Sequence, residues 1–502
     1  MKKKINIVGV TTEAGKEIIE KKEYDRILAS TSNPKLSRVN FDVLNGKYRF
    51  EVDKSEITPL TFSRYILVPF PVGSILSGYT DEIDPKNHYH YHLDFNLDSQ
   101  KVKTHERVFL VFYKLSGNYK IRINSSLVHE GIDGNNIRID IKDHLYESNN
   151  KLDIDFTKSD SEFLGITAQV NVEYTGFNDI KDVRTTVNMR DETVTFNIVS
   201  DDPNGYISLM TPQGSQYQYT FSSNKVVITL PVTVPWTPKE PYMYTYVVEN
   251  NDDKVFGSFA YVCYNISTYK GIPCLLLNRR PYPIKGILDN YFYPDGLTTM
   301  PSYEHSDNML TYIKQLGFNS INVTSRVEIP YFYSNCESRG LLTVVNLNTS
   351  QNLDKEVYYL TKYDSNFLFI INNETKEDNV DLYNKYKKYT INKLLVIKKK
   401  NKTYGDIDLI ENVKDLKKIR LDNQSRAYIL TNFDYGEKIN NSDKFMEFID
   451  NNDYYNYSSK GLIGFFYSNY NSTYNGIFRL DKFQLNENGI KVKSILDKIN
   501  KR

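Results

Sequence analysis

The chain is poor in cysteine and tryptophan, and its charges nearly cancel. Its 502 residues include one Trp and three Cys, an odd number without the close spacing of zinc ligands. This argues against a disulfide-stapled domain and a structural zinc site, so we interpret Cys263, Cys274 and Cys336 as buried free thiols in a reducing compartment. The 63 Lys and Arg and the 62 Asp and Glu leave a net charge of +1, too little to attract nucleic acid or an anionic membrane.

Long apolar runs are also missing. No segment approaches the roughly 20 apolar residues that a transmembrane helix needs. The chain begins with a basic tetrapeptide, but the apolar run at 5–10 is interrupted by Asn6 and is too short for the core of a signal peptide. We therefore expect a cytoplasmic protein without a membrane or nucleic-acid partner, and we expect no metal and no cofactor.

The length predicts several domains, because one hydrophobic core rarely supports so many residues, and we expect three. Residues 1–39 are charged and lack sustained alternation, which indicates a partly ordered N-terminal arm. Between 40 and 165, alternating runs separated by Gly, Asn and Asp clusters predict the antiparallel strands of a β-sandwich. A second set at 166–267, which begins with the strand at 168–174, has the length of one immunoglobulin-like sandwich.

From residue 268 onward, short apolar strands alternate with amphipathic stretches of helical period. This alternation predicts parallel strands with crossover helices. Eight such units over 268–502 make a C-terminal TIM (β/α)8 barrel with short loops, in which catalytic groups sit at the C-terminal ends of the strands. The expected strands are 284–288, 320–323, 341–347, 367–371, 394–397, 407–410, 427–431 and 462–467.

Short motifs in a fixed order support the same architecture. Residues 41–50 resemble an "LNG-W-F" strand, 68–71 with 76–79 resemble a "VPF…LSG" turn, and 234–245 resemble a "WSP-x-x-P-x-L-Y" segment. Further matches lie at 278–286, 293–296, 316–321, 464–469, 475–476 and 481–482. In this order the chain resembles glycoside hydrolase family 2, which holds β-galactosidases, β-glucuronidases and β-mannosidases. The resemblance implies a jelly-roll sandwich, an immunoglobulin-like sandwich and a TIM barrel.

The same resemblance gives positions for a catalytic pair of carboxyl groups, and it implies that one of the two is absent. Retaining hydrolysis uses two carboxyl groups roughly 5 Å apart, one as acid/base and one as nucleophile. Glu374, after the strand at 367–371, matches the acid/base, and Asn373 beside it matches a residue that binds the sugar 2-hydroxyl. The nucleophile position is Asn432, whose amide cannot form a glycosyl ester.

Other positions that the resemblance assigns to substrate binding are also altered. Asn322 and Thr324 stand where the family has an Arg and a His, Asn346 replaces an Asp, and Glu411 replaces a His. Each of those groups orients or charges an atom near the sugar, so their joint loss predicts impaired catalysis. The aromatic residues expected to offer stacking surface beside Glu374 are Tyr291, Tyr293 and Tyr467.

Alternatives stay open for both carboxylates. Asp434 lies two residues beyond Asn432, so it faces the same way at roughly 6.6 Å and is a candidate substitute carboxylate, better suited to inversion. The simpler interpretation of Asp434 is a solvated turn acid before Gly436. Glu374 has a simpler interpretation too, as an acid at a helix N-terminus.

Three histidines share one face of a predicted strand. His88, His90 and His92 alternate with Tyr and Leu, so their imidazoles point the same way. Same-face residues of a strand are nearly collinear, which fits a tetrahedral metal site poorly. We therefore interpret them as a polar outer face.

Two functions follow from these observations. The first is a protein that binds a β-glycoside, or acts as a scaffold, without cleaving it, because function resides in the site and not in the fold. The alternative is an active β-glycosidase that uses Glu374 as acid/base and Asp434 as the second carboxylate. The identity of the sugar and the existence of a homo-oligomer stay open.

Overall fold

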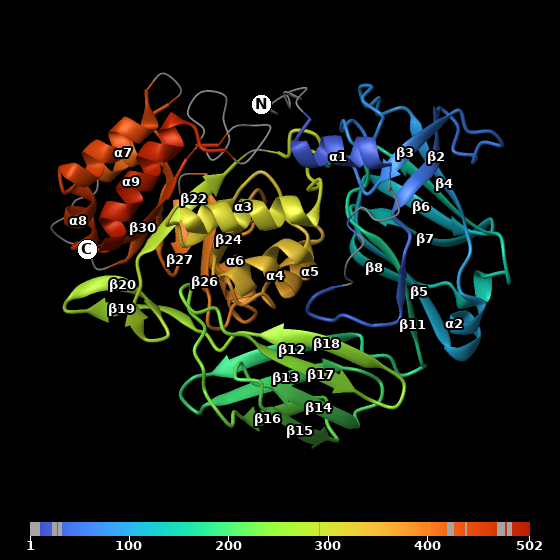
Figure 1. The fold of residues 1–502 in the computed structure, drawn as a ribbon, viewed down its shortest axis with the longest axis horizontal. Coiled ribbons are helices and arrows are strands. Elements are labelled where there is room, and N and C mark those ends of the chain that lie inside the picture. Colours follow the sequence, from blue (N-terminus) through green and yellow to red (C-terminus); the bar gives the residue numbers. More distant parts are fainter. Residues whose placement is uncertain are drawn as a thin grey trace.

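The computed structural model describes residues 11–22, 28, 33–290, 292–400, 402–418, 426–436, 439–468, 477–478 and 484–501. Two β-sandwiches and a mixed strand and helix unit lie side by side (Figure 1). Tyr291 and the motif residues at 469, 475–476 and 481–482 lie outside the described residues. None of the helices in the described ranges has the length and apolarity that a membrane crossing requires.

The first sandwich encloses its own apolar core between two sheets. One sheet has the order β3-β2-β4-β9-β6-β7, and the other has the order β1-β11-β5-β10 with β8 also paired to β5. Alternation positions the core, since every second residue of β6 is buried. The strands are β1 Phe41–Val43, β2 Gly46–Asp53, β3 Arg64–Val68, β4 His88–Phe95, β5 Arg107–Ser116, β6 Asn118–Ile123, β7 Ser126–Ile132, β8 Asn135–Asp140, β9 Asn150–Thr157, β10 Gly165–Ile166 and β11 Val170–Thr175, with helices α2 Ser99–Thr104 and η2 Lys142–His144.

The boundary between the sandwiches differs from the expected one. The strand at 168–174 was expected to begin the second sandwich, but β11 pairs antiparallel with β1 and β5 of the first. All six residues of β11 are buried, so both of its faces are covered. An alternating pattern predicts a strand but not its partner, which long-range register decides.

The second sandwich consists of two sheets, with the orders β12-β13-β16 and β15-β14-β17-β18. Val194, Phe196 and Ile198 of β13 alternate into its core. A three-stranded sheet, β19-β20-β21, then leads to the C-terminal unit. The strands are β12 Asp182–Asn188, β13 Thr193–Val199, β14 Gly205–Met210, β15 Gln216–Phe221, β16 Lys225–Thr229, β17 Tyr244–Glu249, β18 Lys254–Phe259, β19 Tyr264–Tyr269, β20 Ile272–Leu277 and β21 Arg280–Pro281.

The C-terminal unit is a nearly closed sheet of nine strands with the order β27-β26-β25-β24-β23-β22-β30-β29-β28. Eight of them are parallel to their neighbours and match the eight strands expected from the sequence. The strands are β22 Ile284–Asp289, β23 Ser320–Val323, β24 Leu342–Asn348, β25 Asn366–Asn372, β26 Leu394–Lys399, β27 Lys402–Gly405, β28 Asp408–Ile410, β29 Tyr428–Phe433 and β30 Leu462–Tyr467.

Strand β27 was not expected. It pairs antiparallel with β26 where a crossover helix would stand, and the described chain has no pairing that joins β27 to β28. The expected regular eight-unit barrel is therefore found only as a near-closed sheet. Its helices are α3 Tyr303–Gln315, α4 Pro330–Arg339, α5 Leu353–Leu360, α6 Asn379–Lys387, η3 Val413–Lys418, α7 Asn441–Asp450, α8 Asp453–Ser458 and α9 Glu487–Lys501.

The strands of this unit read as continuous apolar runs because both faces of the sheet are buried. In β25, Leu368 and Ile370 belong to one core cluster, together with the buried Trp236. Phe369 and Ile371 belong to another, which packs beneath the helices.

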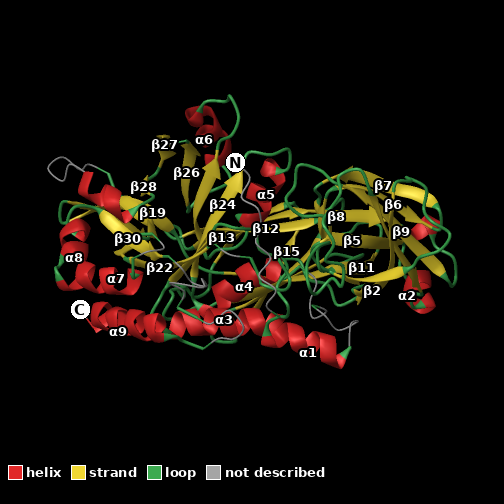
Figure 2. Cartoon of the chain, turned by 90° about the horizontal axis from the view of Figure 1, so that it is seen from above, coloured by secondary structure: helices red, strands yellow, loops and turns green. Residues whose placement is uncertain are grey.

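The N-terminal arm contacts all three parts of the molecule. Helix α1, Glu13–Lys21, lies along the same side of the molecule as α3 and α9 (Figure 2). Its N-cap Thr12 donates from Oγ1 to Asp295 Oδ2 at 2.6 Å. Further along, Lys35 pairs with Glu337 at 2.7 Å, and Arg38 pairs with Glu173 at 2.9 Å and with Asp253 at 2.7 Å. Two of the charges that suggested a loose arm, Lys35 and Arg38, are thus buried and paired.

Candidate functional site

Glu374 follows β25 and is exposed. Its backbone amide donates to Thr349 Oγ1 at 2.9 Å, and its carboxylate has no hydrogen bond or ion pair with any described residue. The interpretation of Glu374 as an acid at a helix N-terminus is wrong, because α6 begins five residues later, at Asn379, with Asp378 as its N-cap. The Asp378 carboxylate accepts a hydrogen bond from the Val380 amide at 2.8 Å.

Asn373 stabilises the loop between β25 and α6. Its Nδ2 donates to Glu377 O at 2.8 Å and to Asn379 Oδ1 at 2.9 Å, while its Oδ1 accepts from the Thr375 amide at 3.0 Å. The side chain is buried, so its polar atoms are occupied within the loop. No group of Asn373 is left for a sugar hydroxyl in this arrangement.

Asn432 and Asp434 stand at the C-terminal end of β29. The Asn432 Oδ1 atom is buried and has no hydrogen-bond partner among the described residues. Asp434 Oδ1 accepts from the Gly436 amide at 2.9 Å and from Asn441 Nδ2 at 2.6 Å. Asp434 thus closes a turn and positions the start of α7.

The altered positions on β23 and β24 bind each other. Asn346 Nδ2 donates to Asn322 Oδ1 at 2.6 Å and to Val323 O at 3.0 Å. Thr324 is exposed. The Glu411 carboxylate, beyond β28, forms an ion pair with Lys398 of β26 at 2.7 Å.

The two described tyrosines of the expected stacking surface are buried. Tyr467 lies in the core, where its ring stacks on Phe433 with centroids 6.2 Å apart, and burial raises the pKa of its hydroxyl. The Tyr293 hydroxyl donates to Glu328 Oε1 at 3.0 Å. No interaction of either ring with Glu374 is found among the described residues, so these two tyrosines do not offer the stacking surface expected there.

A buried ionic cluster that the sequence analysis missed joins the ends of β22 and β23. Arg326 Nη2 donates to Asp289 Oδ2 at 2.9 Å, and its Nε donates to Glu328 Oε1 at 2.6 Å. The guanidinium also lies 4.3 Å from the ring centroid of Tyr293. Burial raises the pKa of Glu328, and burial beside Arg326 lowers the pKa of His305 to about 4. The sequence did contain a signal for this cluster. Asp289 ends one apolar strand, and Arg326 and Glu328 follow shortly after the next.

The histidine face of β4 is covered rather than solvated. His90 and His92 are buried, and their ring nitrogens approach Asp53 and Asp153 at 3.2 and 2.6 Å. Among the described residues, no group of three or more His, Cys, Asp and Glu side chains could hold a metal ion. All three cysteines are free, but only Cys336 is buried, and Cys263 and Cys274 are half-buried.

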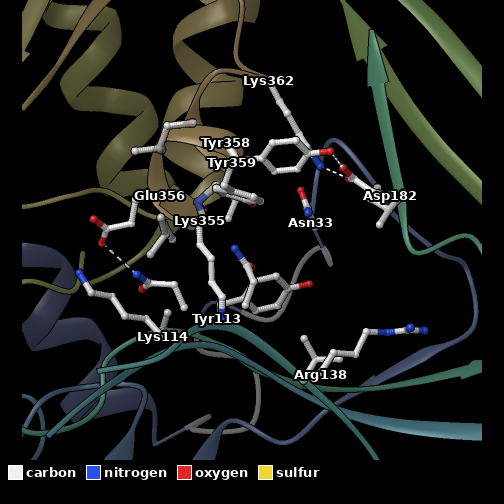
Figure 3. Close-up of a pocket in the computed structure, with 18 of the residues that line it drawn as sticks. Asn33, Tyr113, Lys114, Arg138, Asp182, Lys355, Glu356, Tyr358, Tyr359 and Lys362 are labelled. Carbon is white, nitrogen blue, oxygen red and sulfur yellow. Dashed lines mark hydrogen bonds and ion pairs between the residues drawn. The ribbon is translucent and has the colours of Figure 1, made fainter. Parts of the chain in front are cut away.

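A cavity of about 630 Å³ lies between the three parts of the molecule (Figure 3). Tyr113 of β5 and Arg138 of β8 line it from the first sandwich, and Asp182 of β12 lines it from the second. Lys355 and Tyr359 of α5 line it from the C-terminal unit. The sequence analysis missed this cavity, because its walls come from segments that are far apart in the chain, such as β8 and α5.

Comparisons with known proteins find relatives only among solved structures. No protein-family model and no curated protein matches the chain. A Lactobacillus rhamnosus β-glucuronidase matches with a TM-score of 0.75 and 13% identity over 94% of this chain and 99% of that one. A Ruminococcus gnavus β-glucuronidase in complex with D-glucaro 1,5-lactone matches with a TM-score of 0.71 and 14% identity over 91% and 97% of the two chains.

One further match belongs to the family that the sequence motifs resembled. It is a glycosyl hydrolase family 2 member from Bacteroides cellulosilyticus, with a TM-score of 0.68 and 12% identity over 91% of this chain and 71% of that one. The chain therefore has the fold of the family 2 β-glucuronidases, at 12% to 14% sequence identity to these structures.

Proposed function

We propose that the protein recognises a carbohydrate and does not cleave it by the retaining mechanism. The observation that carries this proposal is the end of β29, where the nucleophile position is Asn432 and its amide oxygen is buried without a partner among the described residues. An amide there cannot form the covalent glycosyl intermediate. Asp434, the nearest carboxylate along the chain, is bound by Gly436 and Asn441.

The acid/base position supports the same proposal. A proton donor for glycosidic cleavage is typically enclosed, because burial favours the neutral acid. Glu374 is exposed and has no described partner for its carboxylate. The Asn322 and Asn346 side chains are neutral amides that are hydrogen-bonded to each other. They therefore offer no charge to a transition state.

The proposal treats the nine-stranded sheet as a (β/α)8-type barrel in which the hairpin strand β27 replaces the fifth helix. In that assignment β22 to β26 are the first five strands and β28 to β30 are the last three, so Glu374 and Asn432 follow the fourth and end the seventh. The D-glucaro 1,5-lactone bound to the R. gnavus β-glucuronidase supports a carbohydrate as the ligand.

The proposal is tested by a trapping experiment and a binding experiment on the same preparation. We expect no hydrolysis of nitrophenyl β-glycosides, including the β-D-glucuronide, and no mass increase after incubation with 2-deoxy-2-fluoroglycosides. We expect calorimetric heat with at least one β-linked disaccharide. A stable adduct on any residue, or the absence of binding by every sugar, would contradict the proposal.

A further inference from the structure

The cavity between the three parts is lined mainly by helix and strand residues. Helix α5 forms one wall, and β5 and β8 form the opposite wall (Figure 3). Asn33 of the N-terminal arm also lines it, next to the segment that the buried Lys35 and Arg38 ion pairs anchor. A preformed concave site of 300 to 1,000 Å³ is typical of small-molecule binding, and about 630 Å³ lies within that range.

Hydrogen-bond donors of the lining are left without acceptors. The Tyr113 hydroxyl and the Arg138 Nη2 atom are buried, and neither donates a hydrogen bond to a described residue. Lys355 is exposed, extends from α5 across the cavity in Figure 3, and forms no ion pair with a described residue. Buried donors are normally satisfied, so such a cluster favours a ligand rich in oxygen acceptors.

Each carboxylate of the lining has a partner, although the buried Glu328 Oε2 atom itself has no hydrogen bond to a described residue. The partners are Arg38 and Arg138 for Glu173, Lys362 for Asp182, Arg326 for Glu328, Lys385 for Asp354 and Asn135 for Glu356. Lys114 is half-buried and donates to Val327 O at 3.4 Å, and the exposed Lys181 pairs with Asp201. Lys355 is therefore the cation of the lining that an incoming group meets first, and it favours a negative charge.

Aromatic rings complete the surface. Tyr358 and Tyr359 on α5 and Tyr389 after α6 line the same cavity, and the rings of Tyr358 and Tyr389 are in edge contact at 6.2 Å. Tyrosine combines an apolar ring face with a polar tip, and the lining adds amides from Asn135 and Asn136. Apolar rings beside fixed polar donors are suited to a sugar ring, which presents C–H groups and hydroxyls.

We propose that this interdomain cavity binds an oligosaccharide that carries an anionic group, with Lys355 pairing to the anion and the Tyr113 hydroxyl donating to a ring substituent. The inference rests on the proposed carbohydrate recognition and assigns it to the cavity instead of the barrel mouth. A sugar carboxylate and a sugar sulfate share this chemistry.

The test is titration calorimetry with three matched probes: cellobiose, its 6-sulfate, and the disaccharide in which the terminal glucose is glucuronate. We expect the wild type to bind one or both anionic probes at least about tenfold more tightly than cellobiose, as a charge-assisted hydrogen bond allows. The probe that binds more tightly identifies the anion.

Two conservative substitutions test whether the ligand binds in this cavity. Lys355→Met removes the charge and should weaken the anionic probes about tenfold while leaving cellobiose nearly unchanged. Tyr113→Phe should weaken all bound probes about threefold or more while the melting temperature is kept or raised, because the deleted hydroxyl has no partner among the described residues. Lys239→Met, at an exposed lysine outside the cavity, is the matched control.

The outcomes separate the two proposals. If a probe binds but Lys355→Met and Tyr113→Phe leave its affinity unchanged, and Glu374→Ala abolishes binding, the ligand sits at the barrel mouth and the cavity assignment is overturned, while carbohydrate recognition stands. If cellobiose binds as tightly as the anionic probes, the anion assignment is overturned. If none of the three probes binds, the cavity assignment is overturned, and carbohydrate recognition also fails if no other β-linked disaccharide gives heat.

Discussion

The ammonium group of Lys35 lies 2.7 Å from the carboxylate of Glu337, and both side chains are almost fully buried. Glu337 belongs to α4 and has further roles. Its backbone carbonyl accepts from Trp236 Nε1 at 2.8 Å, and its carboxylate accepts from the Asp364 amide. One residue of α4 thus joins the N-terminal arm, the segment between β16 and β17 of the second sandwich, and the loop before β25.

Removal of Lys35 should be strongly destabilising. Lys35→Met leaves a buried carboxylate without its cation, which costs about 3 to 5 kcal/mol of unfolding free energy. Lys35→Met with Glu337→Leu should recover much of that loss, because neither charge then remains buried. Urea unfolding of the wild type, both variants and the exposed-pair control Lys21→Met measures this, and equal losses for the single and double variants would contradict it.

The same pair predicts a pH dependence. Burial raises the pKa of Glu337 from 4.5 to about 7, and Lys35 keeps it from rising further. The folded state therefore holds this proton more tightly than the unfolded state. The resulting contribution to stability is complete below about pH 4.5 and is lost as the pH rises through about 7. The stability difference between the wild type and Glu337→Gln, measured at pH 5, 6, 7 and 8, should fall with pH, and a flat difference would refute the assignment.

His305 predicts the opposite slope. Burial and the nearby Arg326 lower the pKa of its imidazole from 6.5 to about 4. The unfolded chain takes up this proton first, so the contribution is complete above pH 6.5 and is lost as the pH falls through about 4. His305→Gln should therefore flatten the acid side of the wild-type stability profile. An unchanged acid limb in thermal melts would show that other groups dominate.

Substitutions of Asp434 distinguish a structural role in the turn from a catalytic role. Asp434→Asn keeps an acceptor for Gly436 and Asn441 and should change the unfolding free energy little, whereas Asp434→Ala should cost about 1 to 2 kcal/mol. Chemical unfolding compares the two variants. If Asp434→Asn abolished a measurable glycosidase activity without loss of stability, Asp434 would be the second carboxylate.

Restoring a carboxylate at residue 432 should not restore hydrolysis. Asn432→Glu places the group at the family's nucleophile position, but Asn322 and Asn346 stay hydrogen-bonded to each other and Glu374 stays solvated. Misplacement by about 1 Å can cost about a hundredfold in rate. Release of nitrophenol from β-glycosides, with Asn432→Gln as the matched control, should stay at background for both variants.

The sequence by itself determined which segments form strands and which chemical group each side chain carries. Eight apolar segments predicted the parallel strands of the C-terminal unit, because strands buried on both faces are continuous in hydrophobicity. The resemblance places Asn432 at the family's nucleophile position, and no fold turns its amide into a carboxylate. The order of short motifs predicted the three-part fold, and the structural matches support it.

The tertiary structure decided what depends on distant partners. Sequence pattern did not reveal that β27 pairs antiparallel with β26 or that β11 pairs with β1 and β5, because strand pairing depends on residues far apart in the chain. The charges of Lys35 and Arg38 indicate a solvated arm until Glu337, Glu173 and Asp253 surround them. Burial of a charged side chain is very costly unless an opposite charge is buried beside it. Here the opposite charges come from residues far apart in the chain, so only the folded structure brings them together.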